Sequence, residues 1–143
     1  MKFILPLLVI LTAVIGSIAN ININADGWYE ELVKSPFNPP GYVFGIVWPI
    51  LYLLMGIVSF LAAEKIWKLF IIQLALNAAW SWIFFYYQLP IIALLDIALL
   101  MLVNAMILNN LKSFSRALFL LYLPYMLWLC FAAFLNISII YLN

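Results

Sequence analysis

The chain has 143 residues, of which 70% are hydrophobic and 8% are charged. Soluble domains are about half apolar and about a quarter charged, so this composition excludes water as the main solvent and indicates an integral membrane protein. The net charge of +1 offers no basic surface for nucleic acid, and the sequence has no histidine, which removes the commonest metal ligand and general base.

Five apolar stretches are long enough to cross the hydrocarbon core of a bilayer, which takes roughly 20 residues in a helix. They are Phe3–Ala19, Tyr42–Ala63, Trp67–Tyr87, Pro90–Leu108 and Ala117–Leu142. The connections are short except the first, from Asn20 to Gly41, so neighbouring helices are expected to be antiparallel. We therefore predict an all-α membrane protein, a bundle of five transmembrane helices with a long first loop, forming a single domain over residues 1–143.

The first stretch, "MKFILPLLVILTAVIGSIAN", has a second interpretation. One lysine, an apolar run and small residues near its end are also typical of a cleaved signal peptide. The apolar run is long for such a signal, and its removal would leave four helices with a long amino-terminal arm. We expect it to be a retained helix.

The basic residues predict an orientation. Five of them fall on the side of the amino terminus, and only Lys34 falls on the other side. The five are Lys2, Lys65, Lys68, Lys112 and Arg116. Because lysine and arginine accumulate in cytoplasmic loops, we expect a cytoplasmic amino terminus and an external first loop, in a bacterial inner membrane.

The first loop, "DGWYEELVKSPFNPP", alternates aromatic and charged residues, as an amphipathic interfacial helix would. Trp28 and Leu32 are four residues apart and would share one helical face. That face is expected either to cover the end of the bundle as a lid or to anchor the loop at the interface. Pro39 and Pro40 then stiffen the chain, and Gly41 allows it to turn into the second span.

The second span carries an aromatic stripe and a proline. Phe44, Trp48 and Tyr52 recur every four residues and lie on one face. Pro49 has no N–H, so the carbonyl of Gly45 lacks its helical donor, which costs several kcal/mol in lipid unless another group satisfies it. A distorted helix that carries tryptophan favours a cavity, although prolines also occur in purely structural membrane helices.

The third span places polar and aromatic side chains on one face. Asn77, Trp80, Ser81 and Phe84 follow one another at spacings of three and four. Interhelical hydrogen bonding is the alternative use of a polar residue in a span. We expect that use for Gln73, whereas Asn77, flanked by aromatic rings, is a candidate pocket residue.

In the fourth span, Asn104 is again expected to bond between helices, and Asp96 is the only carboxylate deep in a span. Asp96 must find a donor across the bundle or be protonated, and a structural or pocket role is favoured over proton relay.

The single cysteine, Cys130, excludes an intramolecular disulfide and is expected to be an inert packing residue.

The fifth span repeats the pattern of the second. Trp128, Ala132 and Asn136 form a stripe at spacing four, with Tyr125 alongside, and Pro124 interrupts the helix. The two proline-distorted, tryptophan-bearing spans are expected to enclose a pocket at membrane depth.

Three segments resemble signatures of the TspO/MBR family, the tryptophan-rich sensory proteins related to the mitochondrial translocator protein. They are "WYEELVKSPFNPPGYVFGIVWPILY", "ALNAAWSWIFF" and "LPYMLWLCFAAFLN", in the family's order. The resemblance implies a five-helix bundle, commonly a homodimer, whose pocket opens toward the first loop and binds porphyrins such as protoporphyrin IX, or isoquinoline and benzodiazepine-type drugs. The ligand-binding residues that it implies are Trp28, Pro40, Phe44, Trp48, Asn77, Trp128 and Ala132.

The chain departs from the family pattern in two places. Ser35 separates Lys34 from the proline that often follows it, which is expected to shift the turn of the loop. Some animal members bind cholesterol through a tyrosine followed by a basic residue, but no lysine or arginine follows Tyr141. The segment "KSFSRAL" fits the reversed pattern, which is weak evidence, so cholesterol binding is not expected.

The leading hypothesis is a membrane sensor or transporter that binds a porphyrin, because flat aromatic macrocycles stack well on tryptophan. Without histidine, a metal-free porphyrin is expected, and no metal and no cofactor are required. One alternative, implied by bacterial relatives, is a light-dependent porphyrin-degrading enzyme that uses pocket tryptophans. Another is a structural assembly protein without a ligand, whose small residues serve only helix packing.

Overall fold

Five long apolar helices account for most of the chain in the computed structural model, which describes the backbone of residues 1–143 and the side chains of residues 1–21 and 27–143. The long helices are α1 (Ile4–Asp26), α3 (Gly41–Leu61), α4 (Ala63–Ser81), α5 (Pro90–Phe114) and α6 (Arg116–Leu142). Each of the five contains, or continues into, a segment long and apolar enough to cross a membrane. The predicted five-helix, all-α membrane protein is confirmed.

Several helices run further than their apolar stretches. The polar residues of "AEKIWK" form the first turns of α4, and a single residue, Ala62, separates it from α3. Likewise α5 continues through "NNLKSF" to Phe114. Lysine, glutamate and asparagine at a helix end lie at the bilayer interface, where water solvates them without unwinding the backbone. Ser115 ends α5 in an extended conformation, and its hydroxyl caps α6 by accepting from the backbone N–H of Leu118.

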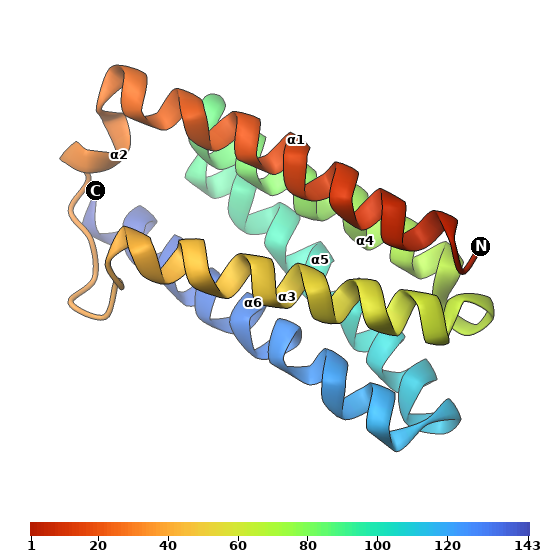
Figure 1. Ribbon diagram of the computed structural model, residues 1–143. Helices are drawn as coiled ribbons and strands as arrows, with labels where there is room; N and C mark the ends of the chain where they lie inside the picture. Colours follow the sequence, from red (N-terminus) through yellow and green to blue (C-terminus); the bar gives the residue numbers. More distant parts are fainter.

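The helices form a ring in the order α1, α3, α6, α5, α4. Figure 1 shows the amino terminus at one end of this bundle, beside the junction of α3 and α4, and the carboxyl terminus at the other end. Lys2 lies at the first of these ends, with its ammonium group 5.4 Å from the ring centroid of Phe60. The short helix α2 (Trp28–Glu31) and the loop that follows it lie at the carboxyl-terminal end.

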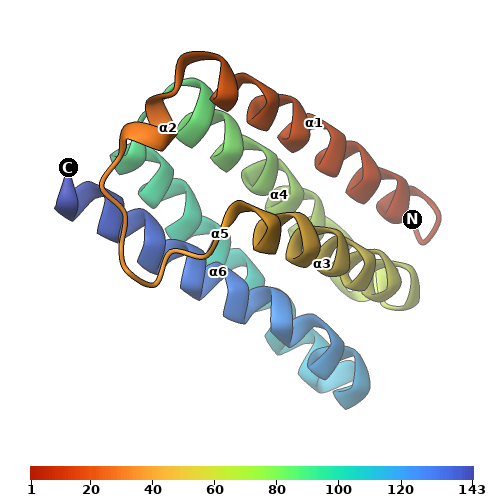
Figure 2. The same ribbon diagram turned by 60° about the vertical axis from the view of Figure 1, so that its left-hand side comes forward.

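The first connection is therefore more structured than a long loop. After α2, residues 32–40 run across the end of α6 before entering α3, as Figure 2 shows. Ser35 forms the turn there, since its carbonyl accepts from Asn38 N at 2.9 Å and its hydroxyl from Phe37 N at 3.1 Å. The side-chain amide of Asn143 bonds both backbone groups of Val33, at 3.0 and 2.9 Å, and so ties this loop to the end of α6.

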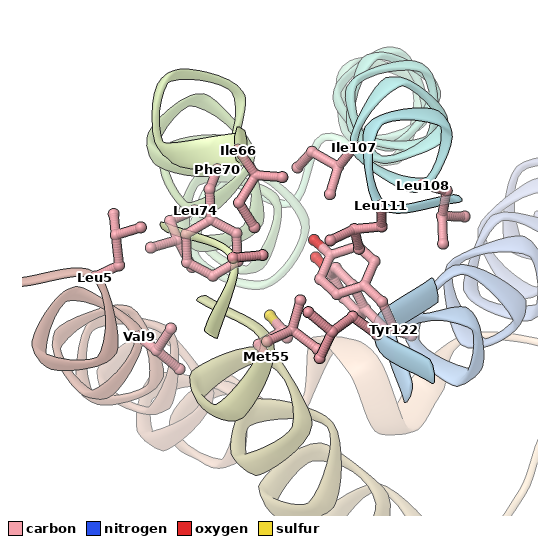
Figure 3. Close-up of a cluster of buried hydrophobic side chains, with 14 of the residues drawn as sticks. Leu5, Val9, Met55, Ile66, Phe70, Leu74, Ile107, Leu108, Leu111 and Tyr122 are labelled. Atoms are coloured by element: carbon pink, nitrogen blue, oxygen red, sulfur yellow. The ribbon is translucent and has the colours of Figure 1, made fainter. Parts of the chain in front are cut away.

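The core at the amino-terminal end is apolar and tightly filled. Figure 3 shows its side chains converging from the helices: Leu5, Val9, Met55, Ile66, Phe70, Leu74, Ile107, Leu108, Leu111 and Tyr122. Most of these side chains are fully buried. Because lipid tails are as apolar as leucine, close packing of this kind, rather than exclusion of water, holds such helices together.

A hydrogen-bonded group lies within that core. Asn104 on α5 donates to Gln73 Oε1 on α4 at 3.4 Å, and the hydroxyl of Tyr122 on α6 donates to Asn104 Oδ1. The hydroxyl of Tyr125 also donates to Gln73 Oε1, at 2.8 Å. The predicted interhelical role of Gln73 and Asn104 is confirmed.

The third span ends in one turn of π-helix, η1 (Trp82–Tyr86), in which the expected continuous helix is widened by a residue per turn. Gln88 then takes a positive φ of 56°, and Pro90 starts α5. The turn carries Phe84 and Phe85 at the carboxyl-terminal end, with their ring centroids 4.8 Å apart. These rings form the base on which α2 rests.

Candidate ligand-binding pocket

A cavity of about 900 Å³ lies between the helices at the end covered by α2 and its loop. Pockets for drug-sized ligands typically have about 300–1,000 Å³. All five long helices contribute to its wall, together with η1, α2 and the loop of residues 32–40. The cavity therefore lies partly at membrane depth and partly beneath the loop.

Aromatic rings from α3 and α6 form one wall. The ring of Trp128 lies edge-to-face with both Phe44, at 5.7 Å, and Trp48, at 6.4 Å. Trp48 in turn contacts Tyr52 at 5.5 Å with the rings only 32° apart. The indole N–H of Trp128 is buried and has no hydrogen-bond partner among the described residues. Buried polar groups in folded proteins usually have a hydrogen-bond partner, so an unpaired donor of this kind is uncommon.

Asn77 lies on the deep side of the cavity with both ends of its amide engaged. Its Oδ1 accepts from the hydroxyl of Tyr52 at 3.0 Å, and its Nδ2 donates to the hydroxyl of Tyr125 at 2.8 Å. The hydroxyl of Tyr125 in turn donates a hydrogen bond to Gln73 Oε1 at 2.8 Å. Hydrogen bonds thus run from the cavity into the core, and they fix the direction in which the Asn77 amide points.

The two prolines lie in different places. Pro49 and Gly45 both line the cavity, so the carbonyl that Pro49 deprives of its donor lies on a helix turn bordering the cavity. Pro124 is exposed on the outside of α6 and does not line it. Of the two predicted distortions, only that of α3 borders the cavity.

The end of the cavity beneath the loop, which we call its mouth, is lined by polar side chains. Tyr29, Glu30, Lys34 and Asn38 line it. The ammonium group of Lys34 lies 4.5 Å from the ring centroid of Tyr29 and donates to the carbonyl of Leu32 at 3.3 Å. Burial is the main cause that raises the pKa of Tyr29 above its ordinary value, so its hydroxyl stays protonated at neutral pH. The one basic residue at this end thus borders the cavity.

The seven residues predicted to bind a ligand do not all lie in the cavity. Six line it: Pro40, Phe44, Trp48, Asn77, Trp128 and Ala132. Trp28 does not, because its ring packs edge-to-face on Phe84 at 5.6 Å. Tyr29 and Glu30 of the same short helix face the cavity instead. Of the two uses foreseen for this segment, the structure favours the lid.

Several lining residues were not singled out as ligand-binding from the sequence. Small residues of α1, Ala13, Gly16 and Ser17, form part of the wall. They are spaced three and four residues apart and so share one helical face, which could have been recognised in the sequence. Trp80 and Asn136 also line the cavity, and the indole N–H of Trp80 donates to Asn136 Oδ1 at 3.0 Å. That bond joins the polar stripes foreseen on the third and fifth spans.

Asp96 lies apart from the cavity lining. Its side chain is buried in α5, and Oδ2 has no hydrogen-bond partner among the described residues. Two states were expected for Asp96, a donor across the bundle or a protonated carboxyl group, and the donor is not found for this oxygen. Cys130 is exposed on the outer surface of α6, rather than packed within the bundle as expected.

Comparison with known proteins gives one consistent result. The family model of the TspO/MBR family matches residues 4–142. The tryptophan-rich protein TspO of Chlorobaculum tepidum is 38% identical over 128 residues, covering 83% of this chain and 81% of the relative. The protein of the same name from Archaeoglobus fulgidus is 38% identical over 81% of this chain and 80% of the relative. The translocator protein of Ovis aries is 34% identical over 76% and 70%.

Proposed function

Since the chain belongs to the TspO/MBR family of integral, multi-pass membrane proteins, we propose that its cavity binds a flat, mostly apolar tetrapyrrole such as protoporphyrin IX. In this proposal the protein acts as a sensor or transporter of that ligand in the membrane. The names of its relatives, tryptophan-rich sensory protein and translocator protein, agree with such a role.

The observation that carries the proposal is the convergence of Phe44, Trp48 and Trp128 on one cavity of about 900 Å³. Aromatic side chains offer flat, polarisable surfaces against which a macrocycle can lie offset or edge-on. The indole N–H of Trp128 is buried and unpaired in that wall, and a small rotation of the ring would be needed for it to donate to a ligand. A mostly apolar cavity with a few fixed polar groups is the usual form of a small-molecule site.

The metal-free form of the porphyrin is the proposed ligand. The chain has no histidine to bind a haem iron, and its one cysteine lies on the outer surface. A free base needs no axial ligand, so apolar and aromatic contacts are sufficient to hold it.

The direct test is a titration of the purified protein in nanodiscs with protoporphyrin IX, in the dark so that photochemistry does not consume the porphyrin. Saturable quenching of tryptophan fluorescence is expected, because three of the six tryptophans, Trp48, Trp80 and Trp128, line the cavity. Quenching that rises linearly with porphyrin, as in empty nanodiscs containing free tryptophan, would contradict the proposal.

Lys34 is proposed to orient the ligand. Protoporphyrin carries two carboxylates, and Lys34 is the basic residue at the mouth, whereas Lys2, Lys65, Lys68, Lys112 and Arg116 belong to the amino-terminal end. The apolar part of the macrocycle would then lie deep, against the aromatic wall, and the carboxylates would face the loop.

Replacing Lys34 by glutamine is expected to weaken binding of protoporphyrin IX by about 2- to 5-fold, since an exposed ion pair contributes up to about 1 kcal/mol. Binding of the dimethyl ester, which has no carboxylate, should not change. Titrations of both porphyrins measure the difference, and Lys112→Gln at the opposite end is the matched control. Equal losses for acid and ester would contradict this orientation.

A further inference from the structure

A second hollow lies on the outer surface of the bundle, between α1 and α3. Its volume is about 860 Å³, and its walls extend along α1 from Pro6 to Ile21 and along α3 from Tyr52 to Leu61. Its lining is aliphatic apart from Phe60, Ser17 and Tyr52. Both helices are candidate membrane spans, so this groove faces the acyl chains of the bilayer.

The groove and the ligand-binding cavity share part of their walls. Ala13, Ser17 and Tyr52 line both of them. These residues therefore form the partition between the lipid-facing side and the interior. The aromatic wall of the cavity begins directly behind it, because Trp48 contacts Tyr52.

The partition is thin on the side of α1. Ala13, Gly16 and Ser17 share one helical face and are among the smallest side chains available. A Cβ atom at Gly16 would lie 3.6 Å from Ser81 Oγ and 4.0 Å from Tyr52 Oη, so glycine leaves space beside the tyrosine hydroxyl. The bulk of the partition is the ring of Tyr52.

The hydroxyl group of Tyr52 is fixed by a single contact. Its hydroxyl makes one hydrogen bond, to Asn77 Oδ1 at 3.0 Å. Opening of the partition past Tyr52 would require that bond to break and the side chain to change its rotamer, and rotamer changes are fast compared with helix motion.

We propose that the ligand reaches the cavity sideways from the bilayer, through the groove between α1 and α3 and past Tyr52. The groove is then a docking surface for the same planar, apolar molecule while it is still dissolved in lipid, and this inference rests on the proposed function. The wall that the groove shares with the cavity, formed by Ala13, Ser17 and Tyr52, supports this occupant. The other access, beneath the loop, is lined by Glu30, Lys34 and Asn38 and suits the carboxylates rather than the apolar ring.

Stopped-flow measurements of protoporphyrin IX binding in nanodiscs test the route with two variants of opposite effect. Ala13→Leu thickens the partition and is expected to lower the association and dissociation rate constants about tenfold each, with a smaller change in affinity. Tyr52→Phe keeps the ring but removes its bond to Asn77, so both rate constants should rise about threefold. Ala98→Leu, on the exposed face of α5 and outside both hollows, is the control and should leave both rates unchanged.

Association rates that match the unmodified protein in both variants, with saturable binding retained, would overturn the lateral route and place access beneath the loop. If Ala13→Leu does not fold, Tyr52→Phe alone decides, because a rate that does not rise contradicts the partition. A total lack of saturable binding in the unmodified chain would instead overturn the proposed function, and the route with it.

Discussion

Protein carrying both Trp48→Ala and Trp128→Ala is expected to bind protoporphyrin IX about 100-fold or more weakly than the unmodified chain, a loss of about 3 kcal/mol. The two indoles lie edge-to-face in the aromatic wall of the cavity, with their ring centroids 6.4 Å apart. Their removal takes away the flat surfaces and the unpaired N–H of Trp128 together. Because the change also removes two fluorophores, the shift of the porphyrin absorption band is the measurement.

Two further proteins sharpen that experiment. Trp48→Phe with Trp128→Phe keeps aromatic rings but no N–H, so its affinity should lie between the two extremes. Trp67→Ala removes a tryptophan that lies outside the cavity, with its ring beneath the ammonium group of Lys68, and should bind normally. Unchanged affinity in the double alanine variant would remove the cavity from consideration as the porphyrin site.

Replacing Asn104 by leucine is expected to destabilise the bundle by about 2 kcal/mol, because it leaves the buried hydroxyl of Tyr122 without a hydrogen-bond acceptor. Asn104 and Tyr122 are both fully buried, and the tyrosine proton is directed at Asn104 Oδ1. After the replacement that hydroxyl has lost the acceptor it uses. Gln73 keeps its bond from Tyr125 and should be affected less. Equilibrium unfolding in mixed micelles measures the change in free energy.

The pair offers its own rescue experiment. Adding Tyr122→Phe to Asn104→Leu removes the stranded hydroxyl, and replacing both partners by apolar groups should restore most of the lost stability. Asn109→Leu, at an exposed position of the same helix, is the control and should change stability by less than about 0.5 kcal/mol. A double variant no more stable than Asn104→Leu alone would show that the hydrogen bond is not the cause.

The spans could be predicted from the sequence because a bilayer imposes one requirement that a single stretch of sequence reveals, a run of apolar residues. Their ends could not be predicted as well. Residues 64–66 and 109–114 were predicted to lie between the spans but are helical in the structure. The π-helical turn at Trp82–Tyr86 was not foreseen either, because its apolar and aromatic residues fit a continuous α-helix equally well.

The cavity shows the same division. Phe44, Trp48 and Asn77 were found from spacing along single helices, which places side chains on a face. Which faces meet depends on the rotation of each helix in the bundle, and spacing does not give that rotation. For this reason the partner of Asn77 on α6, Tyr125, was not identified, and Trp28 was placed over the cavity although it packs on Phe84.

The bond between Asn143 and Val33 has a consequence for ligand affinity. The side-chain amide meets the backbone of Val33 as a neighbouring strand would, with one donor and one acceptor. Together with the turn at Ser35, these bonds restrain the loop of residues 32–40, which borders the cavity, before any ligand arrives. The conformational entropy of this loop is then lost during folding rather than during binding. A preorganised loop of this kind can favour tight binding without adding a contact to the ligand.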